Sequence, residues 1–252
     1  MQLADAAILV VEDEVTLCEI MTAWLRRSAR LVLSAHNGQE AFHLLQQEKI
    51  DVVISDVRMP IMDGVALLRA IRNLPPPHPA VIFITGFSDL EPRDAYGLGI
   101  EAILEKPLER DQLLKAVQRS LSSRAEIWSK PTDAIPAFPL TLTFASREQA
   151  VREKQIAFGH GGFCVSTDRS VPEGPVALRV SFRDDGMVCS GRGEVRWTAP
   201  AESLIGIELT YVDDHCREWA AEQAELHKLE CFIPNSPEPE SSRATVAAAA
   251  KT

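Results

Sequence analysis

One stretch constrains the fold of this chain more than any other: residues 51–64, which read DVVISDVRMPIMDG. It begins with a short apolar run, Val52–Ile54, of the kind that forms a strand buried on both faces of a parallel α/β sheet. Pro60 disfavours helix in the residue before it and therefore indicates a turn. Asp56 is thus predicted at the carboxyl end of a strand, which is where open α/β sheets bind ligands.

Other apolar runs in the first half of the chain repeat this design, and amphipathic segments separate them. The further expected strands are Ala6–Val11, Leu31–Ala35, Ala80–Ile84 and Ile100–Leu104. The expected helices are Val15–Arg27, Glu40–Lys49, Gly64–Arg72, Ser88–Leu98 and Asp111–Leu121. Five strand–helix units in succession predict an α/β doubly wound five-stranded parallel sheet.

Polar residues follow these strands at the ends that right-handed crossovers bring to one edge of the sheet. They are Glu12, Asp13, Asp56, Thr85 and Lys106. Crowded carboxylates repel one another and favour a hard divalent cation such as Mg²⁺, and a lysine can pair with a carboxylate or a phosphoryl group. An aspartate in this setting can attack phosphorus. Taken singly, each of these residues could equally be a turn-former or a solvated strand end.

Residues 6–121 resemble the receiver domain of two-component response regulators. The resemblance is carried, in order, by Glu12-Asp13, Asp56 within DVRMP, Asp63-Gly64, Thr85-Gly86 and Lys106-Pro107. It implies phosphorylation of Asp56 by a sensor histidine kinase or a phosphotransfer protein. It also implies Mg²⁺ bound by Glu12, Asp13, Asp56 and the backbone carbonyl of Arg58, phosphoryl contacts from Thr85 and Lys106, and a cis Lys106–Pro107 bond.

One position departs from that family's pattern. Receiver domains usually carry Tyr or Phe three residues before the lysine, and that ring changes rotamer as the threonine moves. Here the position is Ile103, which fills space but offers neither an aromatic ring nor a hydroxyl. The resemblance therefore preserves the chemistry of the site and leaves open how its state would be transmitted.

The length, composition, net charge and cysteine content of the chain limit the classes of protein to which it can belong. It has 252 residues with 46% hydrophobic and 25% charged residues, which favours two domains of ordinary size. A net charge of −10 argues against broad nucleic-acid binding. No apolar run is long enough to cross a bilayer and no signal peptide is present, so we expect a cytoplasmic protein without membrane insertion. Five scattered cysteines without a CxxC pair predict reduced thiols rather than zinc ligands or disulfides.

The domain boundaries follow from changes in the pattern. We expect a receiver domain at 1–122, an extended proline-containing linker at 123–139, and a β domain at 140–232, followed by a disordered tail at 233–252. Within the linker, Ile127 and Trp128 could continue the preceding helix or pack on the second domain. The β domain alternates apolar and polar residues over several short strands and ends in an amphipathic helix that Asp213 opens. This predicts a small antiparallel β-barrel.

The second half resembles a PilZ domain through FGHGGF, Glu194–Trp197 and Ile205–Leu209. PilZ domains bind cyclic di-GMP through an RxxxR arm and a [D/N]xSxxG turn. Here the turn reads AFGHGG, so only Gly162 is kept, and Arg147 and Arg152 are five residues apart. The lost hydrogen-bonding groups and the missing arginine pair argue against nucleotide binding, for which Arg147, Arg152 and Gly162 would be the remaining candidates.

Three functional hypotheses result. The first is a phosphorylation-switched response regulator whose PilZ-like domain binds an unknown downstream protein, without enzymatic activity. The second is a dual sensor in which the PilZ-like domain still binds cyclic di-GMP. The third, an enzymatic or DNA-binding output, ranks last because residues 140–230 show no nucleophile–base set, metal-ligand cluster or helix-turn-helix pattern.

Overall fold

A computed structural model of the chain describes residues 1–86, 90–130, 137–153, 155–226 and 231–236. It divides into two compact units, Met1–Ser123 and Arg124–Thr252, which we call the first and second domains. Among the described residues, no helix combines the length and the apolar character needed to span a membrane.

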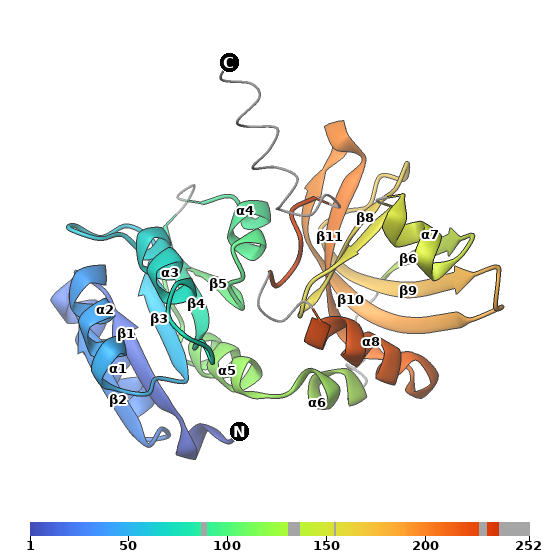
Figure 1. Ribbon diagram of the computed structural model, residues 1–252. Helices are drawn as coiled ribbons and strands as arrows, with labels where there is room; N and C mark the ends of the chain where they lie inside the picture. Colours follow the sequence, from blue (N-terminus) through green and yellow to red (C-terminus); the bar gives the residue numbers. More distant parts are fainter. Residues whose placement is uncertain (87–89, 131–136, 154, 227–230, 237–252) are drawn as a thin grey trace. The chain divides into compact units, whose positions relative to one another are not determined.

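The first domain is a parallel sheet with helices on both faces (Figure 1). The strand order is β2-β1-β3-β4-β5, and every neighbouring pair is parallel, so the predicted five-stranded doubly wound sheet is confirmed. The strands are β1 (Ala7–Val11), β2 (Leu31–Ala35), β3 (Val52–Asp56), β4 (Ala80–Thr85) and β5 (Ala102–Glu105). The helices are α1 (Val15–Arg26), α2 (Gly38–Gln47), α3 (Gly64–Arg72), α4 (Pro92–Gly97) and α5 (Arg110–Leu121), after a short 3₁₀ turn, η1 (Leu3–Asp5).

The core explains why the central strands are continuously apolar. Every residue of β1 and β3 is buried, because helices cover both faces of the sheet. α1 and α5 pack on one face, where Met21 and Leu113 lie in the same cluster as Ile8 and Ile54. α4 is shorter than the predicted helix: it begins at Pro92, which suits the first turn of a helix. Residues 88 and 89 of the predicted range lie outside the described residues.

The second domain is a curled mixed sheet rather than the predicted antiparallel barrel (Figure 1). The order is β6-β9-β10-β11-β8-β7, and β6 pairs with β9 in parallel. The strands are β6 (Phe138–Phe144), β7 (Ile156–Phe158), β8 (Gly162–Ser166), β9 (Gly174–Phe182), β10 (Val188–Ala199) and β11 (Leu204–Val212). Alternation alone cannot distinguish parallel from antiparallel pairing, because both bury every second side chain.

Three helices and a 3₁₀ turn complete the second domain: α6 (Arg124–Ser129), α7 (Arg147–Arg152), α8 (Asp214–Leu226) and η2 (Pro200–Glu202). α6 corrects the prediction of an extended linker, at least over 124–129; residues 131–136 lie outside the described part. Trp128 is 1% exposed within the second domain's core, and its Nε1–H donates to the Leu209 carbonyl at 2.9 Å. Of the two alternatives for Trp128, packing on the second domain is the one observed.

Two other expectations need correction. Ile233, expected to lie in a disordered tail, is fully buried, as is the neighbouring Phe232, whose ring and carbonyl oxygen lie against Gly159 and Gly161. The rest of that predicted tail, 237–252, lies outside the described residues. Cys189 and Cys216, expected to be reduced, form a disulfide with their Cα atoms 5.6 Å apart. Cys18, Cys164 and Cys231 are not part of this disulfide.

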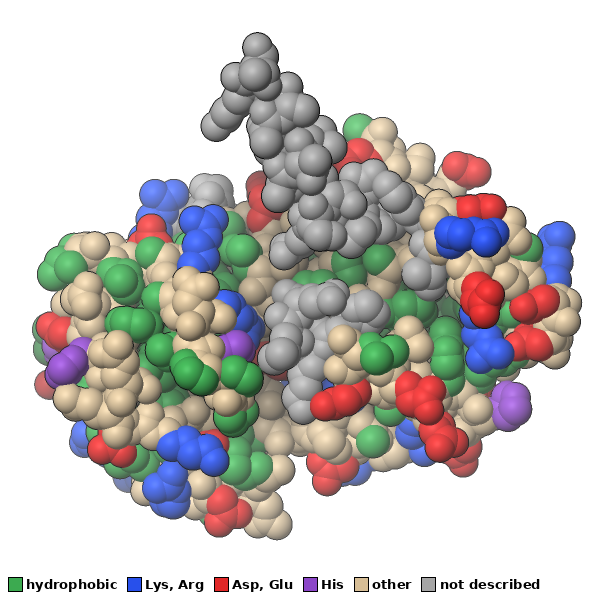
Figure 2. All heavy atoms as spheres, in the orientation of Figure 1, with side chains coloured by type: hydrophobic (Ala, Val, Ile, Leu, Met, Phe, Trp, Pro, Cys, Tyr) green, Lys and Arg blue, Asp and Glu red, His purple; other side chains and the backbone are tan. Residues whose placement is uncertain are grey.

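The surface charge is mixed. On the face that Figure 2 displays, acidic and basic side chains are interspersed over both domains, and the described residues there form no extended basic area. This distribution agrees with the overall charge of −10.

Candidate functional site

Three carboxylates meet at one edge of the first domain's sheet. Glu12 and Asp13 directly follow β1, and Asp56 is the last residue of β3, the neighbouring strand. One oxygen from each lies within 4.8 Å of the others. Glu12 is 1% exposed and Asp56 6%, whereas Asp13 is exposed. The sequence prediction that these residues converge at strand ends is met by this geometry.

Lys106 follows β5 and joins the same cluster. Its Nζ donates to Asp56 Oδ2 at 2.6 Å and to Glu12 Oε1 at 3.3 Å, and it lies 3.0 Å from Glu12 Oε2. Glu12 Oε2 itself is buried and has no partner in hydrogen-bonding geometry. One ammonium group thus faces three acidic side chains, which leaves the cluster with an excess of negative charge.

Burial and charge shift the proton affinities in this cluster. Burial raises the pKa of Glu12 to about 7; the hydrogen bond from Lys106 opposes this shift, and the negative charge of Asp56 adds to it. Burial alone would lower the pKa of Lys106, but its hydrogen bonds to Asp56 and Glu12 outweigh that effect, so the pKa is raised. Lys106 is therefore a permanent cation here, while Glu12 is poised to lose a proton near neutral pH.

The loop after β3 is held close to Asp56. The Arg58 N–H donates to Asp56 Oδ1 at 3.1 Å, which fixes the carboxylate's orientation. Asp63 caps α3 by accepting from the Ala66 N–H at 2.7 Å. A Cβ at Gly64 would lie 2.3 Å from the Asp56 carbonyl oxygen, so only glycine permits this approach. Within the same loop, Ile61 has a φ of 70° and is 82% exposed.

Thr85 and Lys106 are aligned by the ends of β4 and β5. The Lys106 N–H donates to the Thr85 carbonyl at 2.9 Å, and the Lys106–Pro107 bond is cis. Thr85 is 6% exposed, one residue beyond Ile84, which pairs with Asp56 in the sheet. Its hydroxyl donates to the Gly86 carbonyl at 2.9 Å. Ile103 is a half-buried residue of β5 that pairs with Phe83, an ordinary packing position.

The donor set fits a hard divalent cation. Three clustered carboxylates supply oxygen ligands, and Glu12 Oε2 is a buried acceptor without a hydrogen-bond donor. Mg²⁺ typically uses a few protein carboxylates and keeps other positions for water and phosphoryl oxygens. The role of the Arg58 carbonyl as a further ligand stays a prediction.

The predicted nucleotide-contacting residues of the second domain have other contacts. Arg147, on α7, pairs with Asp185 at 2.7 Å, and Arg152 is exposed on the same helix. Gly162 begins β8, where a Cβ would lie 1.9 Å from the Ile207 carbonyl oxygen, so this glycine is required by strand pairing. Within the described part of the domain, no hydrogen bond or ion pair joins these three residues to one another.

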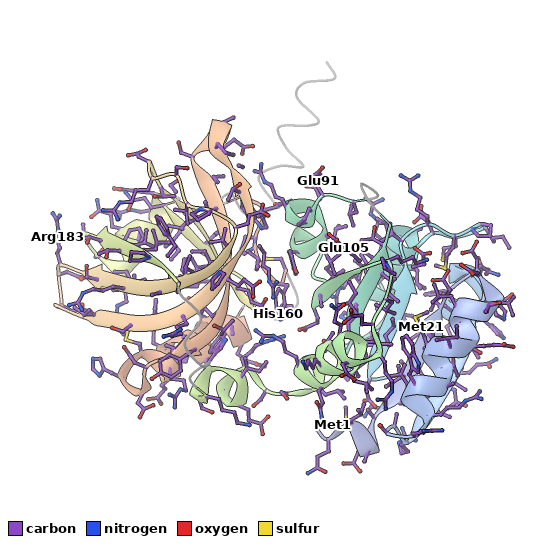
Figure 3. The ribbon with its side chains drawn as sticks, turned by 180° about the vertical axis from the view of Figure 1, so that it is seen from behind. Met1, Met21, Glu91, Glu105, His160 and Arg183 are labelled. Atoms are coloured by element: carbon purple, nitrogen blue, oxygen red, sulfur yellow. A yellow bond between two sulfur atoms is a disulfide. The ribbon has the colours of Figure 1, made fainter. Side chains whose placement is uncertain are left out.

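The glycine-rich turn between β7 and β8 is covered by the chain itself. The N–H groups of His160 and Gly161 donate to the carbonyls of Cys231 and Phe232 at 3.0 and 2.9 Å. The Phe232 ring lies edge-on to His160 at 5.1 Å between centroids, and a Cβ at Gly161 would lie 2.3 Å from that ring. Figure 3 marks His160 in this turn and Glu105 at the end of β5 in the first domain.

A five-stranded parallel sheet with clustered carboxylates, a threonine and a lysine at its carboxyl edge is the arrangement that a receiver domain would show. The sequence model of the "Response regulator receiver domain" family matches residues 8–118. The first domain is a receiver domain of the two-component response regulators.

Individual relatives and solved structures are similar to part of the chain. Transcriptional regulatory protein ZraR of Salmonella typhimurium is 37% identical over 120 residues, 47% of this chain and 27% of that protein. Transcriptional regulatory protein GlrR of Escherichia coli is 29% identical over 156 residues, 60% of this chain and 35% of that protein. The chain thus spans only about a third or less of these relatives' lengths. A crystal structure of a response regulator receiver domain protein from Clostridium thermocellum is 33% identical, with a TM-score of 0.43, over 46% of this chain and 94% of that one.

Sequence reasoning missed the Cys189–Cys216 disulfide. The two residues are 27 positions apart and form no motif. A signal was nevertheless present: Cys189 occupies an inward position of an alternating strand, and Cys216 lies on the apolar stripe of the predicted C-terminal helix. Two inward-facing cysteines in one small domain are candidates for pairing whenever the strand and helix adjoin.

Proposed function

We propose that this protein is a response regulator in which Asp56 accepts a phosphoryl group from a sensor histidine kinase or a phosphotransfer protein. Its second domain then acts as an output that binds a downstream protein, so the chain signals rather than catalyses metabolism. The observation that carries the proposal is Lys106 Nζ, which lies 2.6 Å from Asp56 Oδ2 and 3.0 Å from Glu12 Oε2.

In the transfer step, a carboxylate oxygen of Asp56 attacks the phosphorus of the phosphohistidine. An O–P bond forms at Asp56, and the N–P bond breaks with its electron pair returning to the histidine nitrogen. Lys106 is placed to move from Asp56 to the phosphoryl oxygens as the aspartate loses its charge. Thr85, at the end of the adjacent strand, is placed to offer its hydroxyl on the opposite side.

Mg²⁺ would be held by Glu12, Asp13 and Asp56, with the Arg58 carbonyl as a further ligand. When bound, it offsets the negative charge on the phosphoryl oxygens. The protein's own contribution is the arrangement of carboxylates: Glu12 and Asp56 are buried and fixed before any phosphoryl donor arrives. Such preorganisation avoids reorganising charged groups during the reaction.

A protein donor needs a surface on which to dock. Among the described residues of the first domain, four large apolar side chains are exposed: Ile61 at 82%, Met1 at 56%, Val15 at 54% and Ile20 at 41%. Ile61 and Val15 lie in segments that follow β3 and β1, the adjacent strands that carry the acidic cluster. Exposed apolar residues beside a reactive site are suited to contact with another protein.

Phosphorylation adds about −1.5 to −2 charges at Asp56, which would shift the balance between pre-existing receiver states. The covalent route to the output is short. α5 ends at Leu121, and α6 begins at Arg124 and anchors Trp128 in the second domain's core. Because Ile103 cannot swing an aromatic ring, we expect the transmission to depend on the Thr85 and Lys106 segments and on α5.

Acetyl phosphate with Mg²⁺ tests the first part of the proposal. The intact protein should gain the mass of one phosphoryl group, and Asp56→Asn should not, because an amide oxygen is a poor nucleophile. Asp51→Asn is a matched control in the same loop–strand segment. An equal mass gain in the protein and in Asp56→Asn would contradict the assignment.

A pull-down with and without beryllofluoride tests the output. The phosphoryl mimic should change which proteins are retained, and a truncated chain ending at Ser123 should retain none of the regulated ones. Identical retention with and without the mimic would contradict a phosphorylation-switched output.

Two alternative functions of the second domain, cyclic di-GMP binding and DNA binding, can be tested on the same protein. Cyclic di-GMP binding would use the turn at residues 157–162, and the cover of that turn by Cys231 and Phe232 argues against it. Micromolar or tighter binding of cyclic di-GMP in isothermal titration would reverse this preference. The curated relatives are named transcriptional regulators, so retention on DNA at physiological salt would favour a DNA-binding output.

A further inference from the structure

The C-terminal helix α8 is attached to the second domain's sheet by an unusually small apolar stripe. Its buried residues are Cys216, Ala220 and Ala224, spaced four apart along one face. Burying alanine removes little apolar surface from water, so this stripe by itself stabilises the helix weakly. Trp219 adds edge-on ring contacts to Phe158 and Phe182 at 5.5 and 5.7 Å.

The start of α8 carries two direct links to β10. One is the Cys189–Cys216 disulfide. The other is Asp213, whose carboxylate accepts from the Cys216 N–H at 3.0 Å and from the Ser190 N–H at 2.5 Å. The covalent link and the polar link therefore join neighbouring positions of the same two elements.

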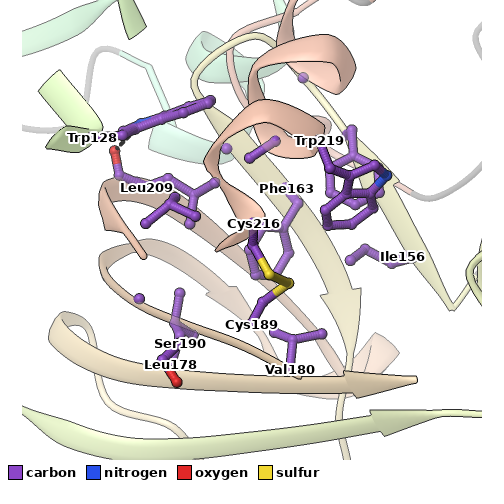
Figure 4. A pocket seen from close by; sticks show the side chains of 16 residues that line it. Trp128, Ile156, Phe163, Leu178, Val180, Cys189, Ser190, Leu209, Cys216 and Trp219 are labelled. Carbon is purple, nitrogen blue, oxygen red and sulfur yellow. Dashed lines mark hydrogen bonds between the residues drawn. A yellow bond between two sulfur atoms is a disulfide. The ribbon is translucent and has the colours of Figure 1, made fainter. Parts of the chain in front are cut away.

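An apolar cavity of about 50 Å³ adjoins the disulfide. Figure 4 shows the yellow S–S bond at its wall, with Trp219 and Phe163 beyond and Trp128 on the far side. Cys189 retains 8% exposure and Cys216 none. Both cysteines line the cavity, so a small reagent that enters it reaches the disulfide.

We propose that Cys189–Cys216 is a redox-responsive site that controls how tightly α8 is attached to the sheet of the second domain. The second domain would then respond to a redox signal of its own. A dithiol reductant is the co-reactant. Its thiolate attacks Cys189 Sγ, forming a mixed disulfide and releasing Cys216 as a thiolate. Its second thiol then attacks its own sulfur in the mixed disulfide and releases Cys189, so two cysteines are reduced and one dithiol is oxidised.

Reduction should loosen α8 rather than unfold it. Asp213 still joins the helix start to Ser190, and Trp219 still packs against Phe158, while the covalent tie is gone. Once the bond is broken, Cys216, which lines the cavity, is free to move away from Cys189. This input goes beyond phosphorylation, because none of its groups belongs to the acidic cluster of the first domain.

Counting accessible thiols tests whether the bond forms and whether it responds. The full chain is incubated with oxidised glutathione or with dithiothreitol, denatured in acid, and alkylated with a maleimide. Of the five cysteines, three should react after oxidation and all five after reduction. Five adducts in both conditions would show that no bond forms. Three in both would show a permanent structural bond. Either result overturns the proposal.

Hydrogen exchange tests the effect on α8. Peptides from 214–226 should exchange at least tenfold faster after reduction, while first-domain peptides keep their rates. Cys189→Ser/Cys216→Ser should show the fast rate in both buffers, and Cys164→Ser, a buried control, should keep the redox response. Should the double variant fail to fold, the intact chain measured in both buffers decides alone. Unchanged α8 exchange, or a change throughout both domains, would contradict the proposal.

Discussion

Lys106 Nζ bridges Asp56 Oδ2 and Glu12 Oε2, at 2.6 and 3.0 Å, so one cation offsets carboxylates from two strand ends. Lys106 directly follows β5 and lies 50 residues beyond Asp56 in the sequence. The cation that pairs with Asp56 thus comes from the segment after the last strand of the sheet.

Replacing Lys106 by Met, which keeps most of the side chain's length, should slow phosphorylation by acetyl phosphate by at least tenfold. The remaining carboxylates would repel one another and the incoming phosphoryl group. Phosphoprotein formation is followed by mass spectrometry over time. Lys115→Met, at an exposed position of α5, is the matched control and should react at the original rate.

Glu12 should make stability depend on pH. Its pKa in the folded protein is about 7 rather than 4.5, so the folded state keeps a proton that the unfolded chain releases. This contribution is fully present below pH 4.5 and is lost as the pH rises through 7, by at most about 3 kcal/mol. Urea unfolding at pH 5 and 8 should show a smaller decline for Glu12→Gln than for the original chain. Glu14→Gln, at an exposed neighbour, should behave like the original, and equal declines in all three would contradict the assignment.

Ile61 should lower the stability of the first domain and contribute to contact with a protein phosphoryl donor. A β-branched residue at φ 70° is strained, and its side chain is 82% exposed, so Ile61→Gly should stabilise the first domain by about 1 kcal/mol. The same change should slow phosphoryl transfer from a protein donor but not from acetyl phosphate. Ile61→Val keeps the branch and should show no gain in denaturant unfolding. Equal transfer rates from the protein donor would remove Ile61 from the docking surface.

Substitutions at Gly161 and Phe232 should have strongly non-additive effects on the free energy of unfolding. A Cβ at Gly161 would lie 2.3 Å from the Phe232 ring, so Gly161→Ala must displace a fully buried side chain. We expect a loss of several kcal/mol in unfolding free energy, comparable to deleting a buried ring. In a Phe232→Ala background the same glycine change should cost about 1 kcal/mol or less, because the clash is gone. Additive losses in this double-mutant cycle would show that the two residues do not meet.

Removing the disulfide should lower stability only under oxidising conditions. Closing a loop between residues 27 apart restricts the unfolded chain, which corresponds to roughly 3–4 kcal/mol in the loop-entropy account. Thermal unfolding of Cys189→Ser/Cys216→Ser should therefore differ from that of the original chain in oxidised buffer and coincide with it in dithiothreitol. A difference that persists in dithiothreitol would point to lost packing instead.

The acidic cluster was predictable because parallel topology converts sequence order into spatial order. Once Glu12, Asp56 and Lys106 are placed at strand ends, right-handed crossovers leave few arrangements other than a shared edge. What could not be predicted was the protonation of Glu12, which depends on how completely the neighbouring segments exclude water.

The second domain was less predictable, since its architecture depends on contacts between distant segments. The alternation in Leu140–Phe144 gave the strand and its buried face, but the parallel partner is β9, more than 30 residues away. The burial of Ile233 could not be predicted for the same reason: a proline-rich composition indicates disorder, whereas the adjacent Phe232 packs against Gly159 and Gly161, more than 70 residues earlier in the chain.

The position of Trp128 determines where the chain should be cut to produce the second domain alone. A fragment that starts at Leu140, the boundary expected from the sequence, would lack Trp128 and the first residues of β6. It would leave a hole the size of an indole ring in the core and a Leu209 carbonyl without its hydrogen-bond donor. Such a fragment would be expected to aggregate for reasons unrelated to signalling. Cutting at Arg124 keeps the tryptophan with the sheet that it completes.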